Sequence, residues 1–132
     1  MEPQITTLLM FEGRAEEAMN LYTEIFDDAQ IEQIDRYGPG EAGAPGSVRH
    51  ATFRLGSQTL RCIDSPVEHA FTFTAAMSLF VDCESRSIVE DLFTALSDGG
   101  TILMPLEEYP FSGLFGWLTD RFGVSWQLNL AS

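Results

Sequence analysis

The sequence predicts an α+β fold built from two βαβββ modules, at about residues 1–66 and 73–132. Three observations predict it. In each half, apolar residues change from strand spacing to helical spacing and back in the same order. Glycine- and proline-containing turns separate the expected elements in both halves. A single shift in residue number aligns the halves, which indicates an internal duplication.

The proposed duplication depends on a helix and a strand that agree on one shift. The helical segment LYTEIF (21–26) aligns with LFTALS (92–97) when its residue numbers are increased by 71. The same shift aligns the strand-like LLM (8–10) with LFV (79–81), without a gap. We therefore expect equivalent residues of the two modules to differ by 71 throughout this stretch.

The first module begins with the apolar run ITTLLMF, which Gly13 interrupts. Apolar residues then recur at helical spacing from Ala15 to Phe26, which predicts a helix. The last two strands flank a Gly-Ser turn and are expected to form a hairpin. Strands are expected at residues 5–11, 31–38, 47–55 and 58–64.

The second module repeats this order. Ser87 and Glu90 have the spacing of a capping box at the start of a helix, and Gly99-Gly100 ends that helix. The helix has an apolar stripe made of Ile88, Val89, Leu92, Phe93 and Leu96. Strands are expected at residues 75–83, 101–106, 113–119 and 124–130, the last two as a second hairpin.

The last expected strand alternates strictly between apolar and polar residues, which is typical of a strand with one buried face. Val124, Trp126, Leu128 and Leu130 are expected beneath the helix. Ser125, Gln127 and Asn129 are then expected on the opposite, uncovered face. A four-stranded sheet with one helix leaves such a face open, so the paired modules are expected to form a concave surface suited to a small ligand.

Charge and cysteine content exclude several classes of protein. The 132 residues contain 7 Lys+Arg and 20 Asp+Glu, a formal net charge of −13, which argues against binding nucleic acid or an anionic membrane. Cys62 and Cys83 lie in apolar runs without metal-type spacing, so free buried thiols are expected. The N-terminal residues MEPQITTLLMFEG lack the pattern of a signal peptide or membrane span. These features predict a cytoplasmic protein.

Three segments resemble the PhnB-like family. VRHATFRLGSQTLRCID (48–64) resembles its HA-x-x-x-x-G-x-x-x-L hairpin, and FEGRAEEAMNLYTEIF (11–26) resembles its opening. TILMPLEEYPFSGLFGWLTDRFGVSWQLN (101–129) resembles its closing segment, in which DRFGVSW is the most specific part. The resemblance covers essentially the whole chain. It implies the vicinal-oxygen-chelate superfamily, with the glyoxalase/bleomycin-resistance/dioxygenase-like fold and a homodimer.

Relatives of this family also carry a methyltransferase name, which the sequence does not support. A methyltransferase of the usual kind needs a Gly-rich turn between a strand and a helix. The segment PGEAGAPG (39–46) joins two expected strands and begins no helix.

The resemblance also implies where a metal would bind, namely on the first and last strands of the modules. The matching residues here are Thr7, Ser78, Gln127 and, by a looser alignment, Arg61. Hydroxyls and an amide are weak ligands for a divalent ion, and a guanidinium repels it. We therefore expect no native metal and no cofactor, and expect these side chains to line a ligand cavity instead.

Two further features are candidates for the same cavity. His50 is either a structural histidine hydrogen-bonded across the sheet or a pocket-lining or catalytic residue. The aromatic residues Tyr109, Phe111, Phe115 and Trp117 either pack in the core or form a pocket wall for a flat or cationic ligand.

The sequence leaves three functions open. The first is a small-molecule-binding protein without a metal, which includes sequestration of an antibiotic as in bleomycin-resistance relatives. The second is a metal-dependent enzyme of glyoxalase or dioxygenase type with unidentified ligands. The third is a structural or interaction protein. The ligand, any reaction and an exchange of modules between subunits are not predicted. The candidate cavity-lining residues are Thr7, His50, Arg61, Ser78, Tyr109, Phe111, Trp117 and Gln127.

Overall fold

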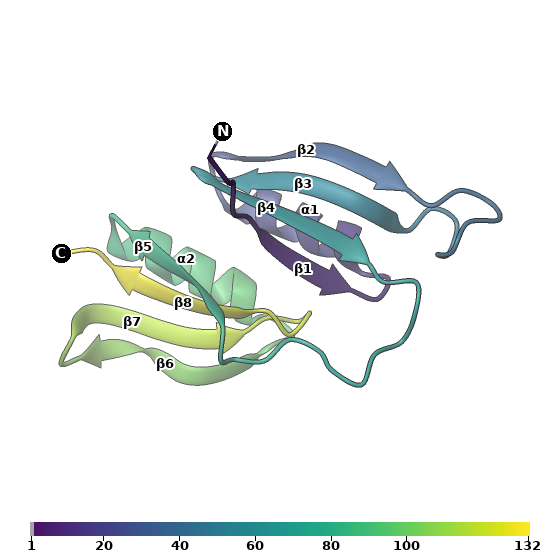
Figure 1. Ribbon diagram of the computed structural model, residues 1–132. Helices are drawn as coiled ribbons and strands as arrows, with labels where there is room; N and C mark the ends of the chain where they lie inside the picture. Colours follow the sequence, from purple (N-terminus) through teal and green to yellow (C-terminus); the bar gives the residue numbers. More distant parts are fainter. Residues whose placement is uncertain (1) are drawn as a thin grey trace. The chain divides into compact units, whose positions relative to one another are not determined.

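The computed structural model describes residues 2–132 and confirms an α+β fold with two βαβββ units. The chain divides into two compact units, Met1–His69 and Ala70–Ser132. Each unit has one four-stranded sheet, and its single helix lies across one face of that sheet (Figure 1). The other face of each sheet carries no helix of its own unit.

The first unit has the strand order β1-β4-β3-β2, in which β1 and β4 are parallel and the other pairs antiparallel. The helix covers the face that holds Phe53, because the rings of Tyr22 and Phe53 stack with centroids 6.3 Å apart. Both side chains are fully buried. The elements are β1 (Thr7–Phe11), α1 (Ala15–Ile25), β2 (Ala29–Arg36), β3 (Val48–Leu55) and β4 (Gln58–Asp64).

The second unit has the equivalent order β5-β8-β7-β6, again with its first and last strands parallel. A Cβ atom at Gly116 would lie 2.4 Å from Cε2 of Phe93, so this glycine lets α2 approach the sheet closely. The elements are β5 (Ser78–Cys83), α2 (Arg86–Ser97), β6 (Thr101–Tyr109), β7 (Ser112–Thr119) and β8 (Ser125–Leu130).

The edge strand β6 is longer than expected, since it continues to Tyr109 instead of ending at residue 106. Pro105 does not stop it, because a strand at the edge of a sheet has unpaired backbone groups and tolerates a residue without an N–H. The register between β6 and β7 is irregular around this proline, with a shift between Met104 and Glu107. The extension brings Tyr109 onto the sheet, where the sequence predicted a loop.

The single offset of 71 between the modules is wrong for the first strand. The helices do differ by 71, since they begin at Ala15 and Arg86 (86 − 15 = 71). The strands before them end at Phe11 and Cys83 (83 − 11 = 72), whose carbonyls accept equivalent hydrogen bonds from the residues that follow β4 and β8. The connection before α2 is therefore one residue shorter, a difference that an ungapped alignment cannot detect.

Helix α2 is capped two residues earlier than the sequence predicted. The Oγ atom of Ser85 accepts a hydrogen bond from the backbone N–H of Ile88 at 3.3 Å, so Ser85 and not Ser87 is the N-cap.

The helices in the described part of the chain are all too short or too polar to cross a membrane.

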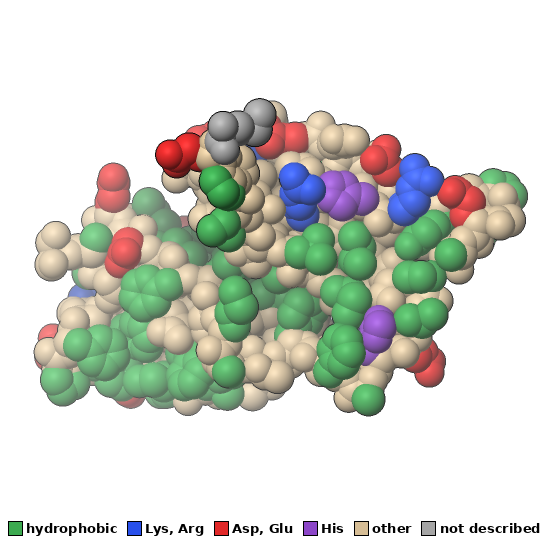
Figure 2. All heavy atoms as spheres, in the orientation of Figure 1, with side chains coloured by type: hydrophobic (Ala, Val, Ile, Leu, Met, Phe, Trp, Pro, Cys, Tyr) green, Lys and Arg blue, Asp and Glu red, His purple; other side chains and the backbone are tan. Residues whose placement is uncertain are grey.

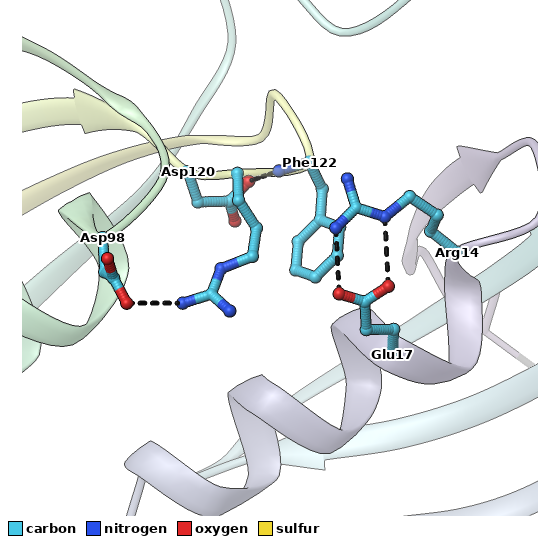
Figure 3. Close-up of polar contacts among 6 residues, drawn as sticks. Arg14, Glu17, Asp98, Asp120 and Phe122 are labelled. Carbon is cyan, nitrogen blue, oxygen red and sulfur yellow. Dashed lines mark hydrogen bonds and ion pairs between the residues drawn. The ribbon is translucent and has the colours of Figure 1, made fainter.

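Two buried carboxylates hold the loops that connect these elements. Asp64 accepts backbone hydrogen bonds from Gly13, Ala15 and Val48 at 2.8–2.9 Å. Asp120 accepts three more, from the backbone of Phe122 and Val124 and from the Trp126 indole. Each carboxylate is 3% exposed. The DRFGVSW segment is thus built around its own aspartate, as the hydrogen bond from Phe122 to Asp120 illustrates (Figure 3).

Candidate functional site

The first candidate site is the face of the second sheet that α2 does not cover. Strand register identifies its residues, because side chains directly opposite one another point to the same face. Trp117 and Phe80 both lie opposite Gln127, and Ser78 lies opposite Ser125. Trp126 and Leu128 alternate with these residues and are buried on the other face, as predicted.

Hydroxyl, amide and indole groups form one network on this face. The Oγ atoms of Ser78 and Ser125 are 2.7 Å apart. Trp117 Nε1 donates to Ser125 Oγ at 2.9 Å, and Gln127 Nε2 donates to Ser78 Oγ at 3.2 Å. The structure thus brings three of the predicted residues, Ser78, Trp117 and Gln127, into one cluster. Ser125 joins them and is almost fully buried.

An aromatic cluster lies on the same face. Phe115 is at its centre, with ring centroids 5.0 Å from Phe111, 5.9 Å from Tyr109 and 6.2 Å from Phe80. The rings of Tyr109 and Phe111 are stacked at 5.6 Å. Phe115 is buried, whereas Phe80 is 56% and Phe111 66% exposed. We call this surface, defined by Phe80, Tyr109, Phe111 and Phe115, the aromatic face.

Hydrophobic side chains gather over the strands of the second unit in the space-filling view (Figure 2). Single exposed apolar residues are ordinary, whereas a contiguous exposed apolar patch is typical of a surface that contacts another molecule. Burial and then the neighbouring charge of Glu107 raise the pKa of Tyr109. Its phenol remains a donor and hydrogen-bonds to the backbone oxygen of Pro105 at 2.7 Å.

A second polar group borders the aromatic face. Asn129 Nδ2 donates to Oδ1 of the exposed Asp82 at 2.9 Å, and Ser112 Oγ donates to Asn129 Oδ1. Asn129 lies opposite both Asp82 and Phe115, which places this group at the other end of the same face. The open face therefore carries aromatic rings next to two hydrogen-bonded polar clusters.

Two contributors to this face, Phe80 and Asp82, were not predicted from the sequence. Phe80 lies in a run that is apolar on both faces, so alternation does not distinguish the covered face from the open one. Pairing with the polar residues of the strand at 124–130 would have identified these residues, but that pairing can be assigned only when the strand order is known.

The open face of the first sheet carries a different set of residues. Arg61 lies opposite Thr52 on β3 and opposite Leu8 on β1. His50 is two residues from Thr52 and therefore on this face as well. The His50 ring has no hydrogen bond to another of residues 2–132. The alternative in which His50 is a structural residue hydrogen-bonded across the sheet therefore lacks that hydrogen bond.

Thr7 does not belong to this face, and the expectation that it shares a surface with Arg61 is wrong. Thr7 lies opposite Leu60. Leu60 is 1% exposed and lies on the face of the sheet that α1 covers. The physical reason is that the connection between β5 and α2 is one residue shorter than the connection between β1 and α1. The residue of the first unit that is equivalent to Ser78 is therefore Thr6 and not Thr7. In a strand, a shift of one residue moves a side chain to the other face.

The residues at the implied metal positions do not fit a divalent ion. Gln127 uses its amide N–H and Ser78 its hydroxyl in the network described above, and Arg61 contributes a cation. Thr7 lies on the covered face. In residues 2–132 there is no group of three or more His, Cys, Asp or Glu side chains that could hold a metal. Neutral hydroxyls, an amide and a guanidinium are a poor donor set for a catalytic metal.

The two cysteines are free and buried, as predicted. Burial, and then the nearby charge of Asp64, raises the pKa of Cys62 to about 12. Burial, and then Asp82, also raises the pKa of Cys83. Because the thiolate is the reactive form, neither side chain is suited to act as a nucleophile at neutral pH.

We expect Cys62 to destabilise the protein at high pH. In the unfolded chain its thiol ionises near pH 9, whereas in the folded protein it stays protonated to about pH 12. Above pH 9 the unfolded state therefore binds fewer protons, so the free energy of unfolding falls as the pH rises toward 12. Urea unfolding of wild type and Cys62→Ala at pH 8 and pH 10 measures this. The loss between the two pH values should be smaller in the variant, and an equal loss would contradict the assignment.

Comparison with known proteins identifies the family. Residues 3–129 match the family model described as 3-demethylubiquinone-9 3-methyltransferase. A solved structure from Bacillus cereus, titled a putative 3-demethylubiquinone-9 3-methyltransferase and PhnB protein, is 56% identical. The match covers 98% of this chain and 100% of that one, with a TM-score of 0.96. Protein PA1353 from Pseudomonas aeruginosa is 30% identical over 98% of each chain, with a TM-score of 0.85.

More distant structures share the fold alone. The fosfomycin resistance protein FosX from Mesorhizobium loti is 12% identical, with a TM-score of 0.59 over 100% of this chain and 95% of that one. The curated proteins contain no match to the chain. The chain therefore belongs to the PhnB-like family, in which the methyltransferase name is a family label.

Proposed function

We propose that the protein binds a small planar molecule on the aromatic face, without a bound metal. The observation that carries this proposal is the position of two exposed phenylalanines, Phe80 and Phe111, beside a hydrogen-bonded polar network on an uncovered sheet face. Burying an aromatic ring against such a cluster is favourable through both apolar area and ring–ring geometry. Few, precisely placed polar groups within an apolar surface are typical of small-molecule sites.

The polar network supplies the orientation of the ligand. Gln127 uses its amide N–H toward Ser78, and its Oε1 atom accepts no hydrogen bond from residues 2–132. This oxygen is the acceptor that a ligand N–H or O–H would engage. Trp117 and Ser125 hold the pair in place, because the indole donates to the hydroxyl that contacts Ser78. We infer that the ligand is planar and carries at least one hydrogen-bond donor.

The proposal requires neither a metal nor a cofactor. The groups at the implied metal positions are neutral or cationic and already hydrogen-bond to one another on the second sheet. It also includes no methyl transfer. The segment at residues 39–46 lies between β2 and β3 and begins no helix, so the Gly-rich strand-to-helix turn of the usual methyltransferases is absent from residues 2–132.

We expect Gln127→Leu to weaken ligand binding with little effect on stability. The probe is 2-naphthol, a planar molecule with one O–H donor, and naphthalene is the comparison compound without the donor. One neutral hydrogen bond contributes about 0.5–1.5 kcal/mol, so the variant should bind 2-naphthol about two- to twelvefold more weakly. Its affinity for naphthalene should be unchanged. Isothermal titration calorimetry measures both affinities.

The matched control is Gln30→Leu, which makes the same chemical change on an exposed strand position of the other unit. This variant should bind both compounds as wild type does. The free energy of unfolding of Gln127→Leu should change by less than about 1 kcal/mol, because Ser78 keeps its hydrogen bond to Ser125. Equal binding of 2-naphthol by both variants, or a loss of several kcal/mol in stability, would refute the role of Gln127.

For the assembly and its setting we propose a homodimer in a reducing cytoplasm. The family resemblance supports the dimer, as do the large apolar side chains left exposed, Val67 and Met77 among them. Two buried thiols without a disulfide support a reducing compartment. Light scattering at micromolar concentration gives the mass in solution, and a mass of 14.7 kDa would exclude the dimer.

A further inference from the structure

The arginines of this chain are unequally partnered. All seven cationic side chains are arginines, set against twenty carboxylates. Five of the seven form ion pairs within residues 2–132, at distances of 2.6–3.4 Å between nitrogen and oxygen for the closest pair of each. One of these pairs, Arg14–Glu17, is drawn in Figure 3. Arg61 and Arg86 form none with the described residues.

The two remaining arginines lie in different surroundings. Arg86 is the first residue of α2 and projects from an exposed helix end. Arg61 lies in the middle of β4, between β1 and β3, on the open face of the first sheet. Arg61 is exposed, and with carboxylates in nearly threefold excess, a guanidinium on a sheet face without an ion pair points to a negative partner from outside the chain.

Other hydrogen-bond donors lie beside Arg61 on this face, and one carboxylate, Asp35 on β2, lies directly opposite His50. The register places Thr52 directly opposite Arg61. His50 is the diagonal neighbour, within the roughly 7–8 Å that separates such positions in an antiparallel pair. Neither His50 nor Arg61 hydrogen-bonds to another described residue, so both have donors available. In Figure 2, Arg and His side chains lie next to each other over the strands of the first unit.

Apolar residues border these donors. Leu8 lies opposite Arg61 on β1 and is 51% exposed. Met10 and Ile63 lie opposite each other further along the same face. A guanidinium binds a carboxylate or phosphate through two parallel hydrogen bonds, and aliphatic side chains beside it favour a ligand with an apolar part.

We propose that Arg61, His50 and Thr52 form a binding site for a small organic oxyanion, a carboxylate or phosphate that carries an apolar group. Arg61 binds the two oxygens, and His50 and Thr52 add single hydrogen bonds. Leu8 and Met10 contact the apolar part of the ligand. This site involves other residues and another unit than the aromatic face, so it stands or fails independently of the function proposed above.

The test is a titration of the full chain with hexanoate, followed by two-dimensional NMR of the Arg Nε–H and His ring signals. Saturable shifts are expected at Arg61 and His50, and Arg61→Gln should weaken hexanoate binding at least tenfold. Arg86→Gln is the matched control, because it removes the same charge from the other unpartnered arginine, and it should bind as wild type does. Arg61→Lys, which keeps the charge but not the paired geometry, should fall between them.

Three results would overturn the proposal. They are wild-type protein that does not bind hexanoate, Arg61→Gln that binds it as well as wild type, and equal weakening by Arg61→Gln and Arg86→Gln. A second titration, with inorganic phosphate, shows whether the site prefers a carboxylate with an apolar part or a phosphate. Because phosphate lacks an apolar part, it should bind more weakly than hexanoate, and tighter binding of phosphate would contradict the role of Leu8 and Met10.

Discussion

Replacement of Asp120 by alanine is expected to lower the free energy of unfolding by about 3–5 kcal/mol. This carboxylate is 3% exposed and accepts three hydrogen bonds. The backbone N–H groups of Phe122 and Val124 bond to Oδ1 at 2.9 and 3.0 Å, and Trp126 Nε1 bonds to Oδ2 at 2.9 Å. Alanine would leave donors buried without partners, and an unsatisfied buried donor costs more than the net value of the bond it made.

Urea unfolding followed by tryptophan fluorescence measures this effect, because Trp126 is one of the affected donors. Asp91→Ala is the control, since it removes the same charge from an exposed position of α2. The control should change stability by less than about 0.5 kcal/mol. If Asp120→Ala were as stable as Asp91→Ala, the DRFGVSW turn would not depend on its aspartate.

A loss of similar size, about 3–5 kcal/mol, is expected for Asp64→Ala in the first unit. Oδ1 of Asp64 accepts from the backbone of Gly13 and Ala15 at the start of α1, and Oδ2 accepts from Val48 at the start of β3. One carboxylate thus joins the ends of three elements. It also places a negative charge at the N-terminus of α1, where the helix dipole favours it.

A graded series distinguishes the hydrogen bonds from the charge. Asp64→Asn can keep an oxygen toward α1 but presents an NH₂ group toward Val48, so its loss should lie between those of wild type and Asp64→Ala. Asp27→Ala, an exposed residue after α1, is the surface control and should be nearly neutral. Thermal and urea unfolding give the order, and a neutral Asp64→Ala would contradict the assignment.

The fold could be predicted because it depends on periodicity that is local in sequence. The hairpin of β3 and β4 and the strand β8 lie within one residue of their expected bounds. The buried and open sides of β8 also follow from its alternation, with Trp126 and Leu128 buried and Gln127 half-exposed. Such alternation is informative because only one face of the strand packs against a helix.

The parts that could not be predicted depend on contacts distant in sequence. Asp64 is 51 and 49 residues from Gly13 and Ala15, the donors it binds, and nothing local indicates that pairing. The sheet face on which Thr7 lies depended on a difference of one residue in the length of the connection before the helix. The pattern of apolar residues does not reveal such a difference. The sequence does not assign Phe80 to a face, because its strand is apolar on both faces, and only pairing with Gln127 places it on the open face.

NMR mapping of bound 2-naphthol shows whether the uncovered face of the second sheet binds a planar ligand. We expect saturable shifts of the Gln127 side-chain amide and the Trp117 indole N–H, together with ring signals of Phe80 and Phe111. The signals of Trp126, which is buried on the other face, should change little. Shifts centred on Trp126 and α2, or no saturable shifts on the aromatic face, would contradict the claim.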